Sequence, residues 1–298
     1  MRITQSGTTT LYLNDINNAR QNIVELQTQV ATQKRVSKPS DDPQAASSIL
    51  RLKSMLASNT QYTTNTNNAL TMMDTTSSTL DSFASILSDV KTSIARASSS
   101  SAGSSELSTY ASSIDQDLDE LLSLANTKYN GKYIFSGTNT QEQPFTLAAD
   151  RSSVSENANG ITGSIKLPIA DGLSQVTNLD GEQAFEGASI FNTLISIRNS
   201  LSSGSAPSTT DQQALDDAYS YVTGQSAKSG MIVSQLTNNQ SSLASQNTQL
   251  QSMLSDQQDT DVASAITKEQ SAETNLEAAL QITAQTLPKS LLTYLSLT

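Results

Sequence analysis

Three groups of aspartates have a spacing that could support chemistry in this sequence. The first, Asp115, Asp117 and Asp119, alternates like the first ligands of a calcium-binding loop. Such a loop needs glycine at its sixth position and glutamate at its twelfth, where this chain has Glu120 and Asn126. The same spacing fits the solvated face of a helix, and we favour that interpretation.

The second group lies in a short proline-rich stretch. Asp41 and Asp42 could hold a metal ion or pair with Arg35. However, Asp42 directly precedes Pro43, and an aspartate followed by proline is typical of a helix N-cap and its first helical residue. We favour the capping role for Asp42.

The third group is Asp256, Asp259 and Asp261, which could supply a carboxylate pair for acid–base catalysis in a cleft. A negatively charged first turn of a helix that begins at Val262 is the simpler interpretation. The chain has no His and no Cys, which excludes His or Cys zinc sites, Ser–His and Cys–His nucleophiles and disulfides. We therefore expect no enzyme and no cofactor.

Composition limits the partners. The formal net charge of -11 opposes binding to nucleic acid or anionic membranes, which needs clustered Lys and Arg. The first residues form no apolar signal core, and no run approaches the ~20 apolar residues that span a bilayer. Only 36% of residues are hydrophobic and 4% aromatic, which favours thin helical interfaces over one thick core.

Hydrophobic periodicity predicts long helices in the N-terminal part. Apolar or small residues recur in steps of three and four over residues 11–33, as in a coiled-coil seam. A second helix begins at Pro43 and runs for over fifty residues, until the Ser- and Gly-rich stretch 98–105. Its seam is polar at Asn59, Thr63 and Thr66, so we expect this stretch to be the weakest and to set the register.

The middle of the chain changes pattern. A third seam over residues 107–125 ends at Asn130-Gly131, which predicts either a left-handed helix stop or a hairpin turn. Residues 132–188 contain short β-prone pieces between Gly, Asn, Asp and Pro, which predicts an inserted, mostly β domain.

Helical periodicity returns over residues 190–201, resumes after Pro207 up to Leu254, and reappears from Val262 to Leu291, with Pro288 interrupting it. The sequence thus predicts a mainly α fold whose long coiled-coil-like terminal helices pack together around a small β insert. The predicted parts are a terminal helical pair (1–38 with 262–298), a helical rod domain (39–131 with 189–261) and an outer β domain (132–188).

The terminal helices have seams too narrow to stabilise them alone. The first helix offers about five large apolar side chains against the ordering of about twenty residues. We therefore expect the terminal pair to be disordered in the monomer and to fold when neighbouring copies cover it. Subunits that add head to tail through non-identical surfaces form open helical arrays, so the pattern predicts a filament-type structural subunit.

Five motifs stand at the ends of the predicted elements. They are Lys34-Arg35-Val36 with Lys38-Pro39-Ser40-Asp41-Asp42-Pro43, the run from Tyr129 to Gly137, Gln143-Pro144-Phe145, Ile190-Phe191-Asn192-Thr193-Leu194, and the ending Ser290-Leu291-Leu292-Thr293-Tyr294-Leu295. Together they resemble flagellin-like hook-filament junction proteins, the third hook-associated protein family. Two departures from the family pattern are Gln33, where glycine is common, and Pro288 within the last helix.

The resemblance implies an extracellular structural adaptor that joins the flagellar hook to the filament after type III export. Its implied partners are copies of itself in a helical ring, the first hook-associated protein on the hook side, flagellin on the filament side, and an export chaperone at the C-terminal helical region. The implied axial positions are Ile16, Ile23, Leu26, Val30, Leu276, Leu280, Leu287, Leu291, Tyr294 and Leu295. The implied inter-layer loop comprises Lys34, Arg35, Pro39, Ser40, Asp41, Asp42 and Pro43.

Three alternatives remain open at this point. Flagellin, the bulk filament subunit, shares the pairing of terminal helices. A surface adhesin would use the exposed β insert for binding, and a peripheral insert could be deleted without loss of assembly. A flagellar peptidoglycan hydrolase would need a carboxylate pair, but the acidic residues of the insert have no recognisable spacing.

Overall fold

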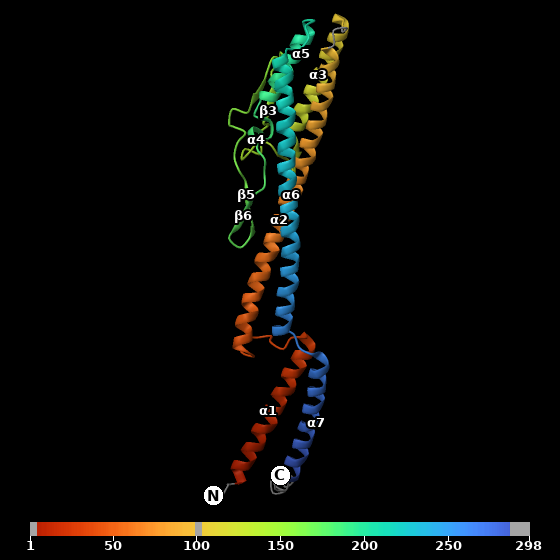
Figure 1. Ribbon diagram of the computed structural model, residues 1–298. Coiled ribbons are helices and arrows are strands. Elements are labelled where there is room, and N and C mark those ends of the chain that lie inside the picture. The colour runs from red at the N-terminus through yellow and green to blue at the C-terminus, as the bar shows by residue number, and fades with distance from the viewer. Residues whose placement is uncertain (1–4, 99–102, 287–298) are drawn as a thin grey trace. The chain divides into compact units, whose positions relative to one another are not determined.

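The computed structural model describes residues 5–98 and 103–286 (Figure 1). The chain forms two compact units. The terminal unit comprises residues 1–58 with 247–298, and the central unit comprises residues 59–246. The fold is mainly α with a small β region, as the sequence predicts. The three-part division remains a prediction.

The helices follow the predicted seams closely. Their bounds are α1 (Gln5–Thr32), α2 (Pro43–Ala97), α3 (Ser104–Ala125), α4 (Gly181–Phe185), α5 (Ser189–Ser202), α6 (Thr209–Gln258) and α7 (Val262–Thr286). α1 begins six residues before the predicted start, and Pro43 is the first residue of α2, as predicted. None of the described helices is long and apolar enough to cross a membrane.

α3 ends at Ala125, five residues before the predicted stop. The side chain of Asn126 pairs with the backbone of Phe145, donating to its carbonyl at 2.9 Å and accepting from its N–H at 3.1 Å. Asn130 and Gly131 instead form the turn of a hairpin, with φ of 52° and 77°. Positive φ at both central residues is what a two-residue hairpin turn requires, so the hairpin alternative is confirmed.

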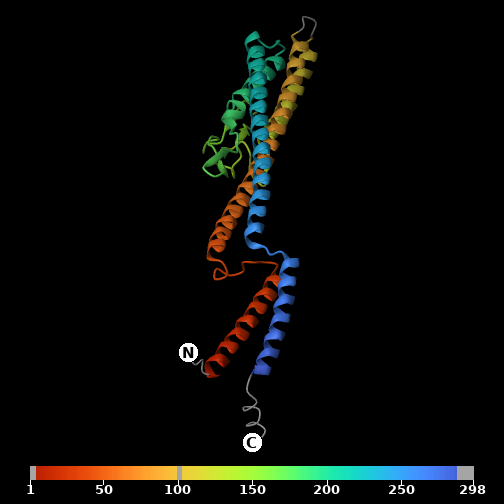
Figure 2. The same cartoon turned by 60° about the horizontal axis from the view of Figure 1, so that its bottom comes forward.

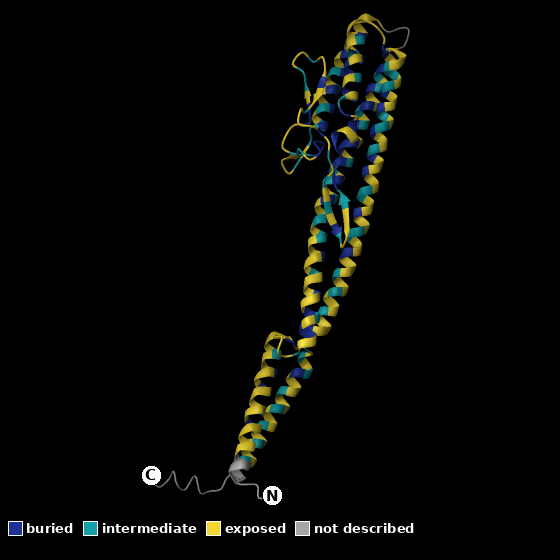
Figure 3. Ribbon diagram, turned by 90° about the vertical axis from the view of Figure 1, so that its left-hand side faces the viewer, coloured by how far each residue is buried: buried dark blue, intermediate teal, exposed yellow. Residues whose placement is uncertain are grey.

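The strands form three separate antiparallel hairpins within the central unit. They are β1 (Lys128–Tyr129) with β2 (Lys132–Tyr133), β3 (Phe145–Leu147) with β4 (Val154–Glu156), and β5 (Lys166–Ala170) with β6 (Leu173–Val176). Figure 1 shows β3, β5, β6 and α4 on one side of the long helices. Figure 3 shows buried residues gathered where these elements meet the helices.

The β-containing region shares its core with the helices. Phe135 and Phe145 are fully buried with Phe83 of α2 and with Phe185 and Phe191. Ring centroids lie 4.6 Å apart for Phe83 and Phe185 and 4.8 Å apart for Phe135 and Phe185. Such aromatic packing is among the strongest contributors to a core. Deleting the insert would therefore remove part of the main core, and the effect of that deletion on assembly remains a prediction.

The polar segment of α2 contacts α6 through side-chain hydrogen bonds. Asn59 is buried and donates to the Leu243 carbonyl at 3.0 Å. Thr66 is also buried and accepts from the Asn239 amide at 3.1 Å. Directional bonds of this kind fix one register between two helices. Thr63, by contrast, bonds within its own helix.

Candidate assembly surface

The axial positions predicted on α1 lie along one side of that helix. Ile16, Ile23 and Leu26 are buried and Val30 is half-buried. α1 contacts α7, and Figure 2 shows the two helices side by side. Steps of seven and three residues keep the buried positions on one face, which gives the narrow seam expected from the sequence.

The axial positions predicted on α7 are less well covered. Leu276 is half-buried, and Leu280 is 39% exposed. Ala265 is buried at the start of the same helix. The other predicted positions, Leu287, Leu291, Tyr294 and Leu295, lie outside the described residues. The part these residues play in assembly remains a prediction.

Exposed hydrophobic side chains concentrate in the terminal unit. Among the described residues, those of the terminal unit are Leu11, Tyr12, Leu13, Val24, Leu50, Met55, Met253, Ile266, Leu280 and Ile282, and those of the larger central unit are Leu173 and Met231. Figure 3 shows many exposed residues on the helices beside the chain ends, together with half-buried and buried ones. Exposed apolar surface gathered on one part of a protein marks an interaction site.

The predicted inter-layer loop is joined to the end of α6 by backbone hydrogen bonds. The Arg35 N–H donates to the Gln258 carbonyl at 2.8 Å, and the Thr260 N–H donates to the Gln33 carbonyl at 3.0 Å. Lys34 and Asp259 form an antiparallel bridge between these bonds. The connection between α1 and α2 and the connection between α6 and α7 are therefore paired by backbone hydrogen bonds within the terminal unit.

Gln33 adopts the left-handed conformation at the end of α1, with φ of 58°. Glycine adopts this conformation without a steric penalty, whereas a residue with a Cβ does so at a cost. The bond from Thr260 to the Gln33 carbonyl holds this backbone in place. α1 therefore ends in a left-handed residue, although this position is Gln33 and not the glycine common in the family that the sequence motifs resemble.

Asp41 and Asp42 both organise the loop through backbone N–H groups. Asp41 accepts from Lys38 at 2.8 Å and from Ser37 at 3.0 Å, and these bonds lower the pKa of its carboxyl. Asp42 accepts from the Ala45 N–H at 3.0 Å, which lowers its pKa, and the Arg35 guanidinium lowers it further. The predicted cap is present, and the alternative pairing with Arg35, at 3.2 Å, accompanies it.

Two contacts of the loop were not predicted. The Arg35 guanidinium also donates to the Gln257 carbonyl at 2.9 Å. Val36 is buried against Ala45, Ala46 and Ile49 of α2. The sequence signal for this small core is Val36 itself, an apolar residue in a charged and polar stretch.

Most of the predicted loop surface is accessible. Asp42 is half-buried, and the other predicted loop residues are exposed: Lys34, Arg35, Pro39, Ser40, Asp41 and Pro43. The loop borders a groove of about 400 Å³ along α1, lined by residues that include Arg20, Val24, Lys38 and Asp41. Val24 is 61% exposed there, so the groove offers an apolar centre with charged edges.

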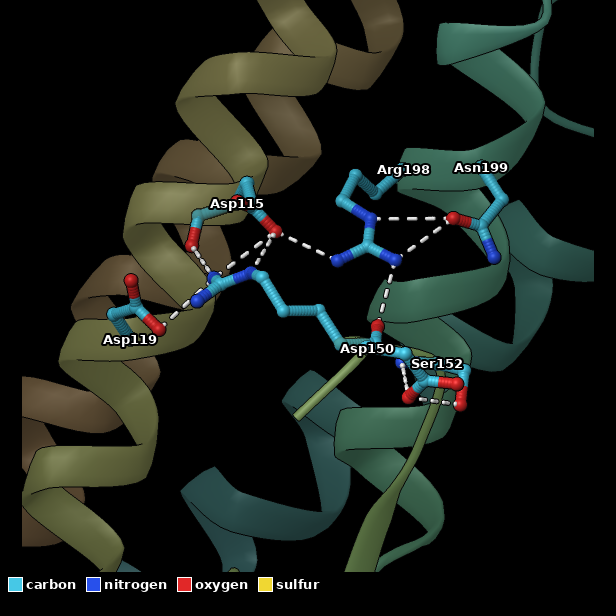
Figure 4. Close-up of polar contacts among 7 residues, drawn as sticks. Asp115, Asp119, Asp150, Ser152, Arg198 and Asn199 are labelled. Atoms are coloured by element: carbon cyan, nitrogen blue, oxygen red, sulfur yellow. Dashed lines mark hydrogen bonds and ion pairs between the residues drawn. The ribbon is translucent and has the colours of Figure 1, made fainter. Parts of the chain in front are cut away.

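The aspartates with calcium-loop spacing lie on α3, as the helix-face interpretation predicts. Asp115 accepts from Arg198 at 2.7 Å and from Arg151 at 3.1 Å, and Asp119 accepts from Arg151 at 2.9 Å (Figure 4). Asp115, Asp119, Arg151 and Arg198 form what we call the polar clamp. It ties the tip of the β3–β4 hairpin to α3 and α5.

The aspartates near the α6–α7 boundary also have structural roles. Asp261 accepts from the backbone N–H groups of Ala263 and Ser264 at 3.1 and 3.2 Å, as a helix N-cap does. Asp259 accepts from the Ser255 hydroxyl at 2.7 Å. Across residues 5–98 and 103–286, no three His, Cys, Asp or Glu side chains gather where they could hold a metal ion.

The N-terminal helical part of this chain is similar to that of flagellin-like proteins. Residues 5–140 match the family described as the bacterial flagellin N-terminal helical region. The resemblance predicted from the loop and hairpin motifs is confirmed by the curated relatives below.

Two curated relatives are flagellar hook-associated protein 3. The protein from Escherichia coli (strain K12) is 32% identical over 161 residues, 53% of this chain and 48% of the relative. The protein from Salmonella typhimurium is 31% identical over 137 residues, 46% of this chain and 43% of the relative. This chain therefore matches only about half the length of these relatives.

Solved structures show the same fold. A provisionally assigned flagellar hook-associated protein from Vibrio parahaemolyticus has a TM-score of 0.65 at 19% identity, covering 74% of this chain and 100% of that one. FlgL from Bacillus cereus has a TM-score of 0.59 at 20% identity, covering 69% of this chain and 99% of that one.

Proposed function

We propose that this chain is a structural, non-enzymatic adaptor of the bacterial flagellum, located at the hook-filament junction. The observation that carries the proposal is the concentration of exposed hydrophobic side chains in the terminal unit. The names of the curated relatives, flagellar hook-associated protein 3, support this assignment over flagellin.

The terminal unit offers surface for further copies. α1 and α7 use one seam to pair, and Leu13 and Val24 remain exposed away from that seam. Covering such side chains gains about 25 cal/mol per Å² of apolar surface removed from water. Neighbouring copies that pack on these faces would complete a bundle that one subunit leaves open.

The remaining parts of the proposal concern partners and location. Different faces of α1 and α7 would meet successive copies, and such heterologous contacts build a helical ring. The first hook-associated protein would bind on the hook side and flagellin on the filament side. An export chaperone would cover the C-terminal helical region until type III export delivers the subunit outside the cell.

The adhesin alternative has less support. Phe135, Phe145 and Phe185 place one side of the β-containing region in the common core, and the exposed apolar side chains that would bind a partner gather in the terminal unit. The charged groove beside Val24 lies in the terminal unit instead.

The experiment replaces exposed apolar residues with aspartate. Val24→Asp alters a side chain of α1 that is 61% exposed, and its matched control is Met231→Asp on α6, which is 67% exposed in the central unit. Both variants should retain the secondary structure and thermal stability of the wild-type subunit. In a strain lacking the wild-type protein, we expect Val24→Asp to abolish filament attachment and Met231→Asp to preserve it.

Normal attachment with Val24→Asp would contradict the proposed surface. A separate measurement distinguishes the adaptor from flagellin: the purified subunit is concentrated alone and observed by electron microscopy. Short oligomers are expected, and long filaments of this subunit alone would overturn the junction assignment.

A further inference from the structure

The β5–β6 hairpin lies across the contact between α2 and α6. Ile169 of β5 is 1% exposed and packs with Ala69 and Met73 of α2 and with Leu236 of α6. Leu167, on the same strand, is half-buried against this cluster. We call residues 166–176 the strap, because their one buried isoleucine touches both long helices.

Two side-chain amides hold the strap, one from each helix. Asn65 of α2 donates to the Pro168 carbonyl at 2.8 Å. Asn239 of α6 donates to the Ile169 carbonyl at 3.1 Å and also to the Thr66 hydroxyl at 3.1 Å. These bonds tie the backbone of β5 to both α2 and α6.

The base of the strap is anchored more firmly than its tip. Asn178 accepts from the Ile165 N–H and donates to the Gly163 carbonyl, both at 2.7 Å. Beside β5, a hollow of about 560 Å³ lies between α2 and the β1–β2 hairpin, bordered by Met72, Tyr129 and Leu167. The strap therefore has an anchored base and open space along one side.

Next to the strap, α2 and α6 contact each other through polar side chains. Over residues 59–67 of α2, Asn59 and Thr66 are the buried residues, and both bond to α6. Asn67 adds a 2.7 Å bond from Gln240. Hydrogen bonds give a register but little net stability. Ile169 adds an apolar contact at one end of this stretch, where it clusters with Ala69 and Leu236, while Leu243 is the buried apolar residue of α6 within it.

We propose that the strap docks reversibly on the α2–α6 pair. When docked, it holds both helices in one register across the polar segment. When released about its anchored base, it lets residues 59–67 and 239–246 open while the aromatic core stays folded. This inference rests on the contacts of the strap alone and does not depend on the flagellar assignment.

The test uses amide hydrogen exchange of the full-length protein, resolved by mass spectrometry. Ile169→Ala removes the buried side chain of the strap. Asn65→Ala removes the hydrogen bond to the Pro168 carbonyl and leaves the apolar cluster intact. We expect exchange at 59–67 and 239–246 to rise about tenfold or more in Ile169→Ala, because deleting a buried isoleucine costs local stability. A smaller rise in the same segments is expected for Asn65→Ala.

Two controls separate release of the strap from general destabilisation. Leu173→Ala changes a side chain of the same hairpin that is 50% exposed, and it should leave exchange at wild-type rates. Residues 107–121 of α3 report on the aromatic core and should exchange at wild-type rates in every variant. The proposal is overturned if the polar segments keep wild-type exchange, or if α3 accelerates as much as they do.

Discussion

Replacing Asp115 with asparagine should destabilise the central unit through the polar clamp. Asp115 is the only described residue that accepts from both Arg151 and Arg198. The Arg198 side chain is 13% exposed, so water replaces its lost partner poorly. Asp115→Asn keeps the size of the side chain and removes the charge, which isolates the electrostatic contribution.

The magnitude follows from the two bonds to arginine. A hydrogen bond to a charged group contributes about 1.5–3 kcal/mol when buried, and exposed ion pairs contribute about 0.2–1 kcal/mol. Because Arg151 and Asp115 are each about a third exposed, we expect a total loss of about 2–3 kcal/mol. In a unit of this size that loss lowers the melting temperature by roughly 4–12 °C.

The pH dependence gives a second readout. Burial raises the pKa of Asp115, but Arg198 and Arg151 outweigh that effect and lower it below its usual value. The clamp therefore contributes stability above the unfolded pKa and loses it as pH falls through the lower folded pKa. Wild type and Asp115→Asn should differ at pH 7 and converge in strong acid.

Asp117→Asn is the matched control on the same helix. Burial, Glu120 and Asp89 raise the pKa of Asp117. Its charge is therefore unfavourable above the raised pKa, and its removal should leave stability at pH 7 unchanged or slightly higher. Thermal unfolding of the three proteins from strong acid to pH 7 measures both effects. Equal melting temperatures of wild type and Asp115→Asn at pH 7 would refute the account of the clamp.

Three further predictions concern single positions. Gln33→Gly should stabilise the end of α1 by about 1 kcal/mol in the assembled protein, because a side chain with a Cβ is strained at the left-handed φ and glycine is not. Amide exchange at the end of α1 should slow in the assembled protein, and faster exchange would contradict the reasoning. Phe185→Ala should cost about 3–5 kcal/mol through a cavity in the aromatic core, whereas an equal melting temperature would show that the core tolerates the loss. The backbone N–H groups of Lys38 and Ser37 lower the pKa of Asp41, so Asp41→Asn should loosen the loop at pH values above that pKa. The amides of Ser37 and Lys38 should exchange faster than in wild type at pH 7 and at the wild-type rate in strong acid.

The regular elements could be predicted because their signals are local. Heptad spacing located the long helices, Asp42 before Pro43 located the start of α2, and Asn130-Gly131 located a hairpin. The polar seam residues Asn59 and Thr66 also make the cross-helix bonds expected of them.

The contacts that could not be predicted join residues far apart in the chain. Arg151 reaches Asp115, and Ile169 reaches Ala69, through loops whose path has no periodic signal. The aromatic core joins α2 to phenylalanines of the predicted insert, and β-prone spacing carries no signal for these contacts. The early end of α3 likewise depends on Phe145, which lies 19 residues after Asn126.

The most direct test of the proposed function compares the terminal helices in the free and the assembled subunit. Backbone amide exchange is measured by NMR in the monomer and by mass spectrometry after assembly. We predict that α1 and α7 exchange far faster than α3 in the monomer and become protected on assembly. Protection of α1 and α7 equal to that of α3 in the free monomer would show that they need no partner and would contradict the proposal.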